Sequence, residues 1–280
     1  MRVRIPLAAL SLAAGLALAP VHADTTIEEK RTLEPGGTFL LDAAGGTVTV
    51  RGTTSSGARI VIHSRRDDLR DLYDFKFEES PGQVRVTIKR KSALDKLWHG
   101  DSMDIRVEIP KDTRVDVQTA GGSLDVEDVT RDVKLRTSGG SVEGERLGAR
   151  VDAGTSGGSI KLSAIAGDIV ANTSGGTIRI EGAGGKVDAE TSGGGIETRF
   201  AAGNARGGKL ETSGGGVRVY LDPAVDLTLD AATSGGTVTS ALPITGPVNE
   251  DHDSVQGAIG KGGETLRIRS SGGSIRVEKI

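Results

Sequence analysis

The chain has 280 residues, a formal net charge of −3, no cysteine and only 2% aromatic residues, while 42 residues are glycine. This composition excludes a thick core of large side chains, and the missing cysteines exclude disulfides, thiolate metal sites and a cysteine nucleophile. The weakly acidic, mixed charge argues against nucleic acid or anionic lipid as a main partner.

Residues 1–23 are predicted to be a signal peptide. Two arginines precede an apolar run over residues 5–18, and residues 21–23 (VHA) fit the small-x-small rule for cleavage. The apolar run is shorter than the roughly 20 residues of a spanning helix. We expect a mature chain from Asp24 that is exported and has no transmembrane segment. It would be periplasmic, on the cell surface or secreted.

Residues 24–118 are predicted to form irregular β coils and a cap. Short runs of alternating apolar and polar residues are typical of strands with one buried face. They lie at residues 39–50, 59–63, 73–77, 84–88, 105–109 and 115–117. We expect longer first coils with an antiparallel excursion that covers the open edge of the following repeats.

Residues 119–280 are predicted to form a regular repeat, continuous with the preceding part in one domain. A motif of the type TSGG, followed by Ser, Thr or Gly and then an aliphatic residue, starts at Thr119, Thr137, Thr155, Thr173, Thr191, Thr212, Thr233 and, as SSGG, at Ser270. The first five starts are 18 residues apart, and the next two steps are 21 residues. A fixed period of this kind is typical of a solenoid whose successive repeats stack on one another.

Each coil of about 18 residues is expected to hold two short strands and two corners, which gives an all-β, single-stranded parallel β-solenoid. The threonine of the motif should point inward, and the glycine pair should form the corner. These residues therefore have a structural explanation as a turn motif without any ligand. The glycines are Gly121, Gly122, Gly139, Gly140, Gly157, Gly158, Gly175, Gly176, Gly193, Gly194, Gly214, Gly215, Gly235, Gly236, Gly272 and Gly273. A loop over residues 241–263 is expected to interrupt the last coils.

Three stretches carry a resemblance to a known family. They are the TSGG runs, IRVEIPKDTRVDVQT at Ile105–Thr119 and GAIGKGGETLRIRSSGGSIRVEK at Gly257–Lys279. The chain resembles the DUF4097 putative-adhesin family of bacterial β-strand repeat proteins over almost its whole mature length. The resemblance implies a β-solenoid that is exported and has a surface or envelope role. It offers no catalytic motif that could be transferred residue by residue.

No residue pattern points to a catalytic, metal or cofactor site. His63, His99 and His252 are widely separated, and the corners lack the carboxylates of calcium-binding β-rolls. The serines of the repeats have no recurring base. Trp98 and His252 are the speculative partner-surface residues, although the preferred interpretations are that Trp98 covers the end of the rod and that His252 lies in a solvated loop.

The preferred function is that of a non-enzymatic, exported β-solenoid, an adhesin or an envelope interaction protein. Its partner would be a protein or glycan of the envelope or the extracellular space. Two alternatives stay open: a polysaccharide-processing β-helix enzyme, and a structural spacer or sensor module of an envelope complex. An enzyme should show a cleft with paired carboxylates, a binder an exposed patch, and a spacer neither.

Overall fold

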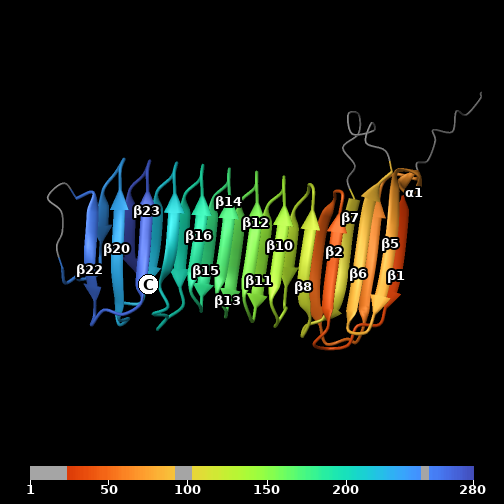
Figure 1. The fold of residues 1–280 in the computed structure, drawn as a ribbon, viewed down its shortest axis with the longest axis horizontal. Helices are drawn as coiled ribbons and strands as arrows, with labels where there is room; N and C mark the ends of the chain where they lie inside the picture. Colours follow the sequence, from red (N-terminus) through yellow and green to blue (C-terminus); the bar gives the residue numbers. More distant parts are fainter. Residues whose placement is uncertain (1–23, 92–102, 247–251) are drawn as a thin grey trace, which may run out of the picture.

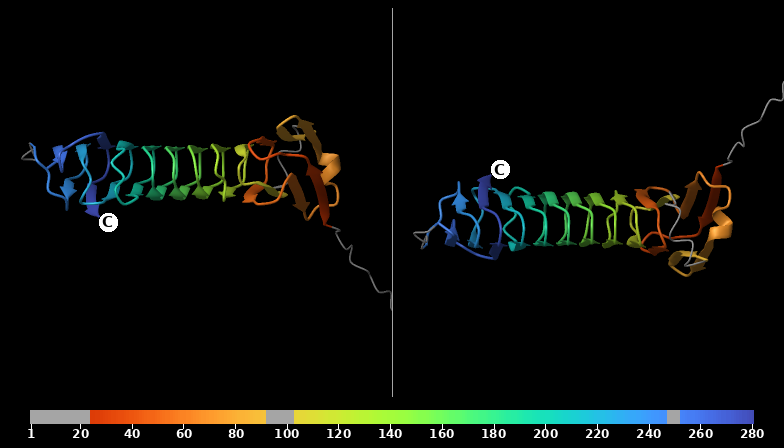
Figure 2. Two further views of the ribbon diagram at one scale, coloured as in Figure 1. Left: turned by 90° about the horizontal axis from the view of Figure 1, so that it is seen from below. Right: turned by 90° about the horizontal axis from the view of Figure 1, so that it is seen from above.

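The computed structural model describes residues 24–91, 103–246 and 252–280. The predicted signal peptide lies outside the described residues, as does Trp98. The described residues form an elongated rod built from two twelve-stranded sheets that face each other (Figures 1 and 2). One short helix, α1 (Leu69–Leu72), lies at the N-terminal end of the rod.

We name the two sheets A and B and give their strands in spatial order. Sheet A contains β1 (Thr25–Arg31), β4 (Ala58–Ser64), β7 (Met103–Pro110), β3 (Thr47–Thr53), β9 (Leu124–Glu127), β11 (Val142–Leu147), β13 (Ile160–Ile165), β15 (Ile178–Ala183), β17 (Ile196–Phe200), β19 (Val217–Leu221), β24 (Ile275–Lys279) and β21 (Val238–Ser240). Sheet B contains β22 (Ser254–Ile259), β20 (Leu227–Thr233), β23 (Thr265–Ser270), β18 (Gly208–Thr212), β16 (Val187–Thr191), β14 (Ile169–Thr173), β12 (Val151–Thr155), β10 (Val133–Thr137), β8 (Arg114–Thr119), β2 (Thr38–Ala43), β6 (Gln83–Arg90) and β5 (Tyr73–Ser80).

In the middle of the rod, each coil adds one strand to each sheet. Thr137 is the register partner of Thr155, which in turn is the partner of Thr173. Every pairing from β8 to β18 in sheet B is parallel, as is every pairing from β9 to β19 in sheet A. The predicted parallel β-solenoid with two strands in each coil is therefore confirmed.

The core fills the space between the two sheets. Side chains alternate along each strand, so that in β10 Val133 and Leu135 are buried while Lys134 is exposed. Most of the core consists of Val, Ile, Leu and Ala, and Phe39 and Phe200 are the largest fully buried side chains. This thin aliphatic core is what a chain with few aromatic residues can build.

The N-terminal end of the rod is irregular and partly antiparallel, as predicted. β1 pairs antiparallel with β4, β4 with β7, and β5 with β6. The outermost strands at this end, β1 and β5, are thus antiparallel additions that cover the edges of the parallel stack. The division of the chain at residue 118 remains a prediction.

The stacking order at both ends of the rod differs from the order of the chain. The last coil (β23 and β24) lies between the coil of β18 and β19 and the coil of β20 and β21. At the other end, the first coil (β2 and β3) lies between β6 and β7 on one side and β8 and β9 on the other. The expectation that successive repeats stack in chain order is wrong at these two places. Coils of equal width and register can pair with any similar coil, so the repeat alone does not specify its neighbour.

Two irregular segments also contain defined structure among their described residues. The segment 241–263, expected to be a loop, contains β22, which pairs antiparallel with β20. The longer step between the motifs at Thr191 and Thr212 is accommodated by a wider corner that Asn204 fills. The buried Asn204 amide donates hydrogen bonds to the carbonyl oxygens of Ala183 (2.6 Å) and Gly185 (3.0 Å).

Candidate functional site

The threonines of the TSGG motif are buried and bonded to the backbone of an adjacent coil. The hydroxyl groups of Thr155, Thr173 and Thr191 each donate a hydrogen bond of 2.8 Å to the carbonyl oxygen of Gly140, Gly158 and Gly176, respectively. The same bond recurs at Thr137, Thr212, Thr233 and Ser270, and Thr119 bonds Gly46 and Gly121. These hydroxyl groups are engaged in stacking, which supports the structural interpretation of the motif.

The second glycine of the motif stands where neighbouring coils come closest. A β carbon at Gly140 would overlap the carbonyl group of Gly122 in the preceding coil, and one at Gly158 would overlap that of Gly140. At the first glycine, Gly139, a β carbon would have its nearest neighbour at 3.9 Å. The close approach of the backbones explains why the second position is glycine in every motif.

The two residues predicted as a speculative partner surface are not brought together in the described part of the chain. Trp98 lies outside it. His252 is exposed with a left-handed φ of 55°, and its carbonyl oxygen accepts a hydrogen bond of 2.7 Å from the Val238 amide. Among the described residues no group of three or more His, Cys, Asp or Glu side chains is placed to hold a metal ion.

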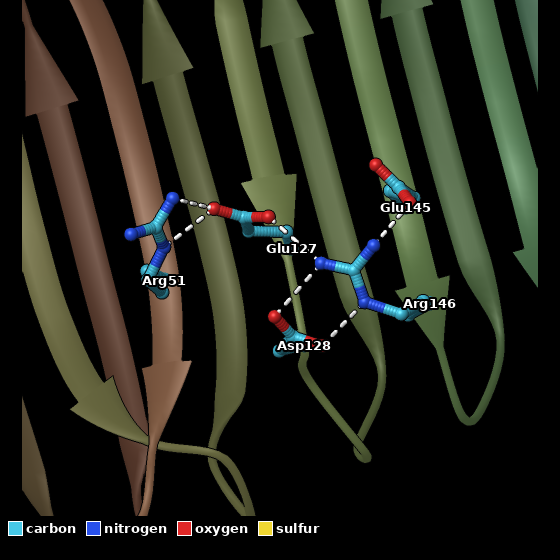
Figure 3. A network of polar contacts seen from close by, with 5 residues as sticks. All are labelled: Arg51, Glu127, Asp128, Glu145 and Arg146. Atoms are coloured by element: carbon cyan, nitrogen blue, oxygen red, sulfur yellow. Dashed lines mark hydrogen bonds and ion pairs between the residues drawn. The ribbon is translucent and has the colours of Figure 1, made fainter.

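An ion-pair network joins the first coil to the regular stack on the outer face of sheet A (Figure 3). Glu127 binds Arg51 on one side and Arg146 (2.8 Å) on the other. Arg146 also binds Asp128 through two hydrogen bonds of 2.6 and 2.9 Å, which lower the pKa of Asp128. Both Asp128 and Arg146 have left-handed φ angles, 61° and 54°, so the chain bends where the network forms. Because these charged groups pair with one another, the network serves to hold neighbouring coils together.

Next to the network, Asp125 and Glu143 are exposed neighbours on β9 and β11. Partial desolvation of the carboxyl by the surrounding side chains, followed by the charges of Glu127 and Glu143, raises the pKa of Asp125 above its ordinary value. These carboxylates make the outer face of sheet A acidic over β9 and β11, near the middle of the sheet.

A groove with a cavity volume of about 250 Å³ crosses the outer face of sheet A farther toward the C-terminal end of the rod. It passes over β15, β17, β19 and β24 and contains the side chains of Arg179, Glu197, Arg218 and Arg276. Arg179 forms an ion pair of 3.3 Å with Glu197. Arg218 and Arg276 are exposed register partners on adjacent strands, and neither has an ion pair with another described residue.

The groove exists because two of the corner motifs that line it lack a side chain at one position. The position after the glycine pair carries a hydroxyl side chain at Ser159, Thr177 and Ser274, but it is glycine at residues 195 and 216. Gly195 and Gly216 line the groove, between Thr177 and Ser274. Two missing side chains thus open the surface between the arginines.

The sequence alone does not predict this groove. In the repeats before Arg179, the equivalent position carries Asp125, Glu143 and Lys161, a mixture of charges that is typical of a solvated face. Chain order would also place Arg276 in a coil beyond that of Thr239. The intercalation of the last coil instead brings Arg276 beside Arg218. The TSGGG variants at Thr191 and Thr212, each followed two residues later by a charged residue, are the signal that could have marked the groove floor.

The outer face of sheet B has a different charge pattern, with opposite charges in adjacent coils. Lys134 pairs with Asp116 (3.6 Å), Arg136 with Asp152 (2.7 Å), and Asp230 with both Arg267 (3.1 Å) and Arg269 (2.8 Å). Hydrogen bonds from Arg269 and Arg267 lower the pKa of Asp230 despite its partial burial, which acts in the opposite direction. A cavity of about 230 Å³ on this face is lined by as many cations as carboxylates: Arg114, Lys134 and Arg150, with Asp116, Asp132 and Asp152. Because its charges balance, the groove on sheet A is the candidate site.

Two further properties bear on the surface as a whole. In the described ranges, no helix has the length and apolar character needed to span a membrane. Ile280 is the one large hydrophobic side chain that is exposed in the described part of the chain. The groove therefore has no apolar patch beside it.

The fold is similar to that of several solved structures. A "putative adhesin" from Bacteroides fragilis is 13% identical, with 91% of this chain and 97% of that chain covered, and has a TM-score of 0.51, which supports the same fold. A "putative adhesin" from Parabacteroides distasonis is 11% identical, with 91% and 97% covered and a TM-score of 0.48. A "putative lipid binding protein" from the same species is 16% identical, with 91% and 96% covered and a TM-score of 0.45.

No curated protein matches this chain. The model of the family described as Toastrack DUF4097 matches residues 40–278, which include all eight corner motifs and nearly all strands of both sheets. The resemblance drawn from the TSGG runs is thereby confirmed, and the chain belongs to the Toastrack DUF4097 family.

Proposed function

We propose that this protein is an exported, non-enzymatic binding protein of the bacterial envelope or cell surface, and that it contacts its partner through the outer face of sheet A. The observation that carries the proposal is the open groove with two arginines, Arg218 and Arg276, that lack an ion pair within the described chain. The predicted signal peptide and the adhesin names of the fold relatives are consistent with this role.

The chemistry of the groove suits binding better than catalysis. A guanidinium group stays protonated in proteins, so it cannot exchange a proton as a general acid or base. Glu197 is the one carboxylate in the groove, and it is engaged by Arg179. Hydrolysis of a glycosidic bond generally needs two carboxylates on either side of the bond. The enzymatic alternative therefore finds no support in this groove.

The carboxylates around Asp125 do not revive the enzymatic alternative. Asp125 and Glu143 lie side by side on one sheet face, so they cannot flank a substrate from opposite sides. Glu127, the next carboxylate, is held between Arg51 and Arg146 (Figure 3). A spacer without a binding role would need no open groove with two adjacent arginines that lack a carboxylate partner among the described residues, so this groove is the feature that favours a binder.

The export part of the proposal is tested by fractionating cells that produce the full chain. We expect the protein outside the cytoplasm with Asp24 as its first residue. Full-length protein retained in the cytoplasm would contradict the proposal.

The binding part is tested by retention of purified residues 24–280 on isolated bacterial envelope material. We expect the double variant Arg218→Ala/Arg276→Ala to lose retention. The matched control is Arg85→Ala/Arg150→Ala, which removes two exposed arginines on the side of sheet B. Retention that is equal in both double variants would show that the groove is not the contact surface.

A further inference from the structure

The arginine pair in the groove is electrostatically unfavourable in the isolated protein. Arg218 and Arg276 are directly opposite on the parallel strands β19 and β24, and like charges in this position destabilise a sheet. The other register partner of Arg218 is Glu197, but this carboxylate forms its ion pair with Arg179. With Arg179 and Glu197 included, the groove holds three cations and one anion. An anionic ligand between the two free guanidinium groups would relieve this repulsion.

The shape of the groove indicates an extended ligand. It crosses four neighbouring strands, which at the usual strand spacing of about 4.8 Å corresponds to roughly 14 Å along the rod. Its floor consists of the glycines at 195 and 216, and the hydroxyl residues Thr177 and Ser274 lie beside them. Backbone and hydroxyl groups of this kind form hydrogen bonds with the hydroxyl groups of a sugar chain.

We propose that this groove binds an acidic polysaccharide, with Arg218 and Arg276 pairing with oxyanions carried on the sugar chain. The inference rests on the proposed binding function and names the class of its ligand. The planar guanidinium group donates two parallel hydrogen bonds to a carboxylate or to a sulfate or phosphate group. Arg179, paired with Glu197, borders the groove on the side of β15.

Other classes of polyanion or partner fit this surface less well. A nucleic acid duplex lying along sheet A would meet the carboxylates of Asp125 and Glu143. Protein interfaces depend on aromatic or aliphatic anchors in pockets, and the groove offers no such pocket. Insertion into a lipid surface needs exposed apolar side chains, of which the described chain shows only Ile280.

The test is calorimetric titration of residues 24–280 with polygalacturonate, dextran sulfate and fully methyl-esterified polygalacturonate. We expect the first two to bind, more weakly as salt rises, and the neutral ester not to bind. The stronger of the two acidic polymers identifies the preferred anion. Arg218→Ala/Arg276→Ala should weaken binding about 10- to 100-fold, because two charge-assisted contacts are lost. The control Arg85→Ala/Arg150→Ala should keep the affinity of the unmodified chain.

A third variant guards against misfolding as the cause of lost binding. Glu197→Gln removes the one negative charge of the groove and frees Arg179, so it should tighten binding of the acidic polymers. No binding of either acidic polymer, equal binding of the neutral ester, or equal losses in the two double arginine variants would overturn the inference.

Failure of this inference can be separated from failure of the proposed function. If the acidic polymers do not bind but envelope retention still depends on Arg218 and Arg276, the ligand class is wrong and the binding function stands. Saturable binding of an acidic peptide or an oligonucleotide in place of the polysaccharides would likewise show that the ligand class is wrong. If envelope retention is independent of both arginines, the proposed function fails as well.

Discussion

Two kinds of buried threonine occur in the core. The corner threonines, such as Thr191, donate a hydrogen bond to a glycine carbonyl group of an adjacent coil. Thr198 instead lies in the middle of β17, and its hydroxyl group has no hydrogen-bond partner among the described residues. Its inward-facing register neighbours are Ile180 and Val219. Burying an unpaired hydroxyl group costs free energy, whereas burying a bonded one does not.

The same substitution should therefore have opposite effects at the two threonines. Thr198→Val replaces an unpaired hydroxyl group with a methyl group of similar size and should raise the free energy of unfolding by about 1 kcal/mol. Thr191→Val removes a hydrogen bond and leaves the Gly176 carbonyl group without its partner, so it should lower that free energy by about 1 kcal/mol. Urea unfolding of residues 24–280 measures both. A shift of the same sign in both variants would contradict the assignment.

The raised pKa of Asp125 predicts a pH-dependent effect on stability. A carboxyl group whose pKa is higher in the folded state than in the unfolded state destabilises the fold wherever it is ionised. Asp125→Asn should therefore raise the melting temperature at pH 7. The gain should fade as the pH drops through the raised pKa, and it should vanish below the unfolded value of about 3.9.

Asp128→Asn is the matched comparison for this titration. The hydrogen bond from Arg146 lowers the pKa of Asp128, so ionised Asp128 favours the folded state above the unfolded pKa. This variant should lower the melting temperature at pH 7, and the loss should fade toward low pH. Melting curves between pH 3 and 7 test both variants, and a pH-independent gain for Asp125→Asn would rule out the electrostatic cause.

At the scale of the element, the corner of each coil fixes the distance between neighbouring backbones. The second glycine of the motif lies against the backbone of an adjacent corner throughout the stack. The first glycine has room for a β carbon at Gly121 and Gly139 but not at Gly214, where the nearest atom would be 2.7 Å away. The threonine hydroxyl then bonds a glycine carbonyl group of the adjacent corner from the inside. The hydroxyl residue and the second glycine of the corner therefore set the spacing between stacked coils.

The two adjacent glycines of one corner should therefore differ sharply in how well they tolerate substitution by alanine. Gly140→Ala forces its β carbon against the backbone of Gly122 and should lower the free energy of unfolding by about 2–3 kcal/mol. Gly139→Ala meets no atom closer than 3.9 Å and should change it by less than about 0.5 kcal/mol. Chemical unfolding of the two variants provides the comparison. Similar costs at both positions would show that backbone freedom, and not the close approach, sets the requirement for glycine.

At the scale of the whole molecule, much of the regular stack could be predicted from the sequence. The period places Thr137, Thr155 and Thr173 in one row, and the structure has them as register partners. The position of the last coil could not be predicted, because its SSGGSI corner and strand lengths would pair equally well at the end of the stack. The groove depends on that position, since it is the inserted coil that puts Arg276 beside Arg218. The local sequence pattern therefore predicts the structure of each coil but not which coils lie next to it.

The inserted coil predicts that two deletions of similar length have different effects. Removing residues 155–172 joins Gly154 to Thr173 in register and should give a shorter rod that still unfolds cooperatively. Removing residues 264–280 takes a coil from inside the stack and leaves β20 and β21 without their parallel partners. Residues 227–259 should then become sensitive to protease.

Limited proteolysis with mass spectrometry, together with small-angle scattering, distinguishes the two deletion proteins. The internal deletion should shorten the rod by about 4.8 Å, the spacing of one strand. If the protein without residues 264–280 keeps residues 227–259 protected, the outer coil is stable without the inserted one and the prediction is wrong.

The position of the last coil also sets a constraint on how the molecule is made. Translation delivers residues 227–259 before residues 265–279, yet in the finished rod the earlier segment covers the later one. Assembly in the order of synthesis, which suits the middle of the rod, cannot complete this end. The earlier segment must stay detached, or detach again, until the later strands have docked onto β18 and β19. The folding protein therefore passes through an intermediate in which β20 and β21 are not yet packed, because β23 and β24 have not yet joined the sheets.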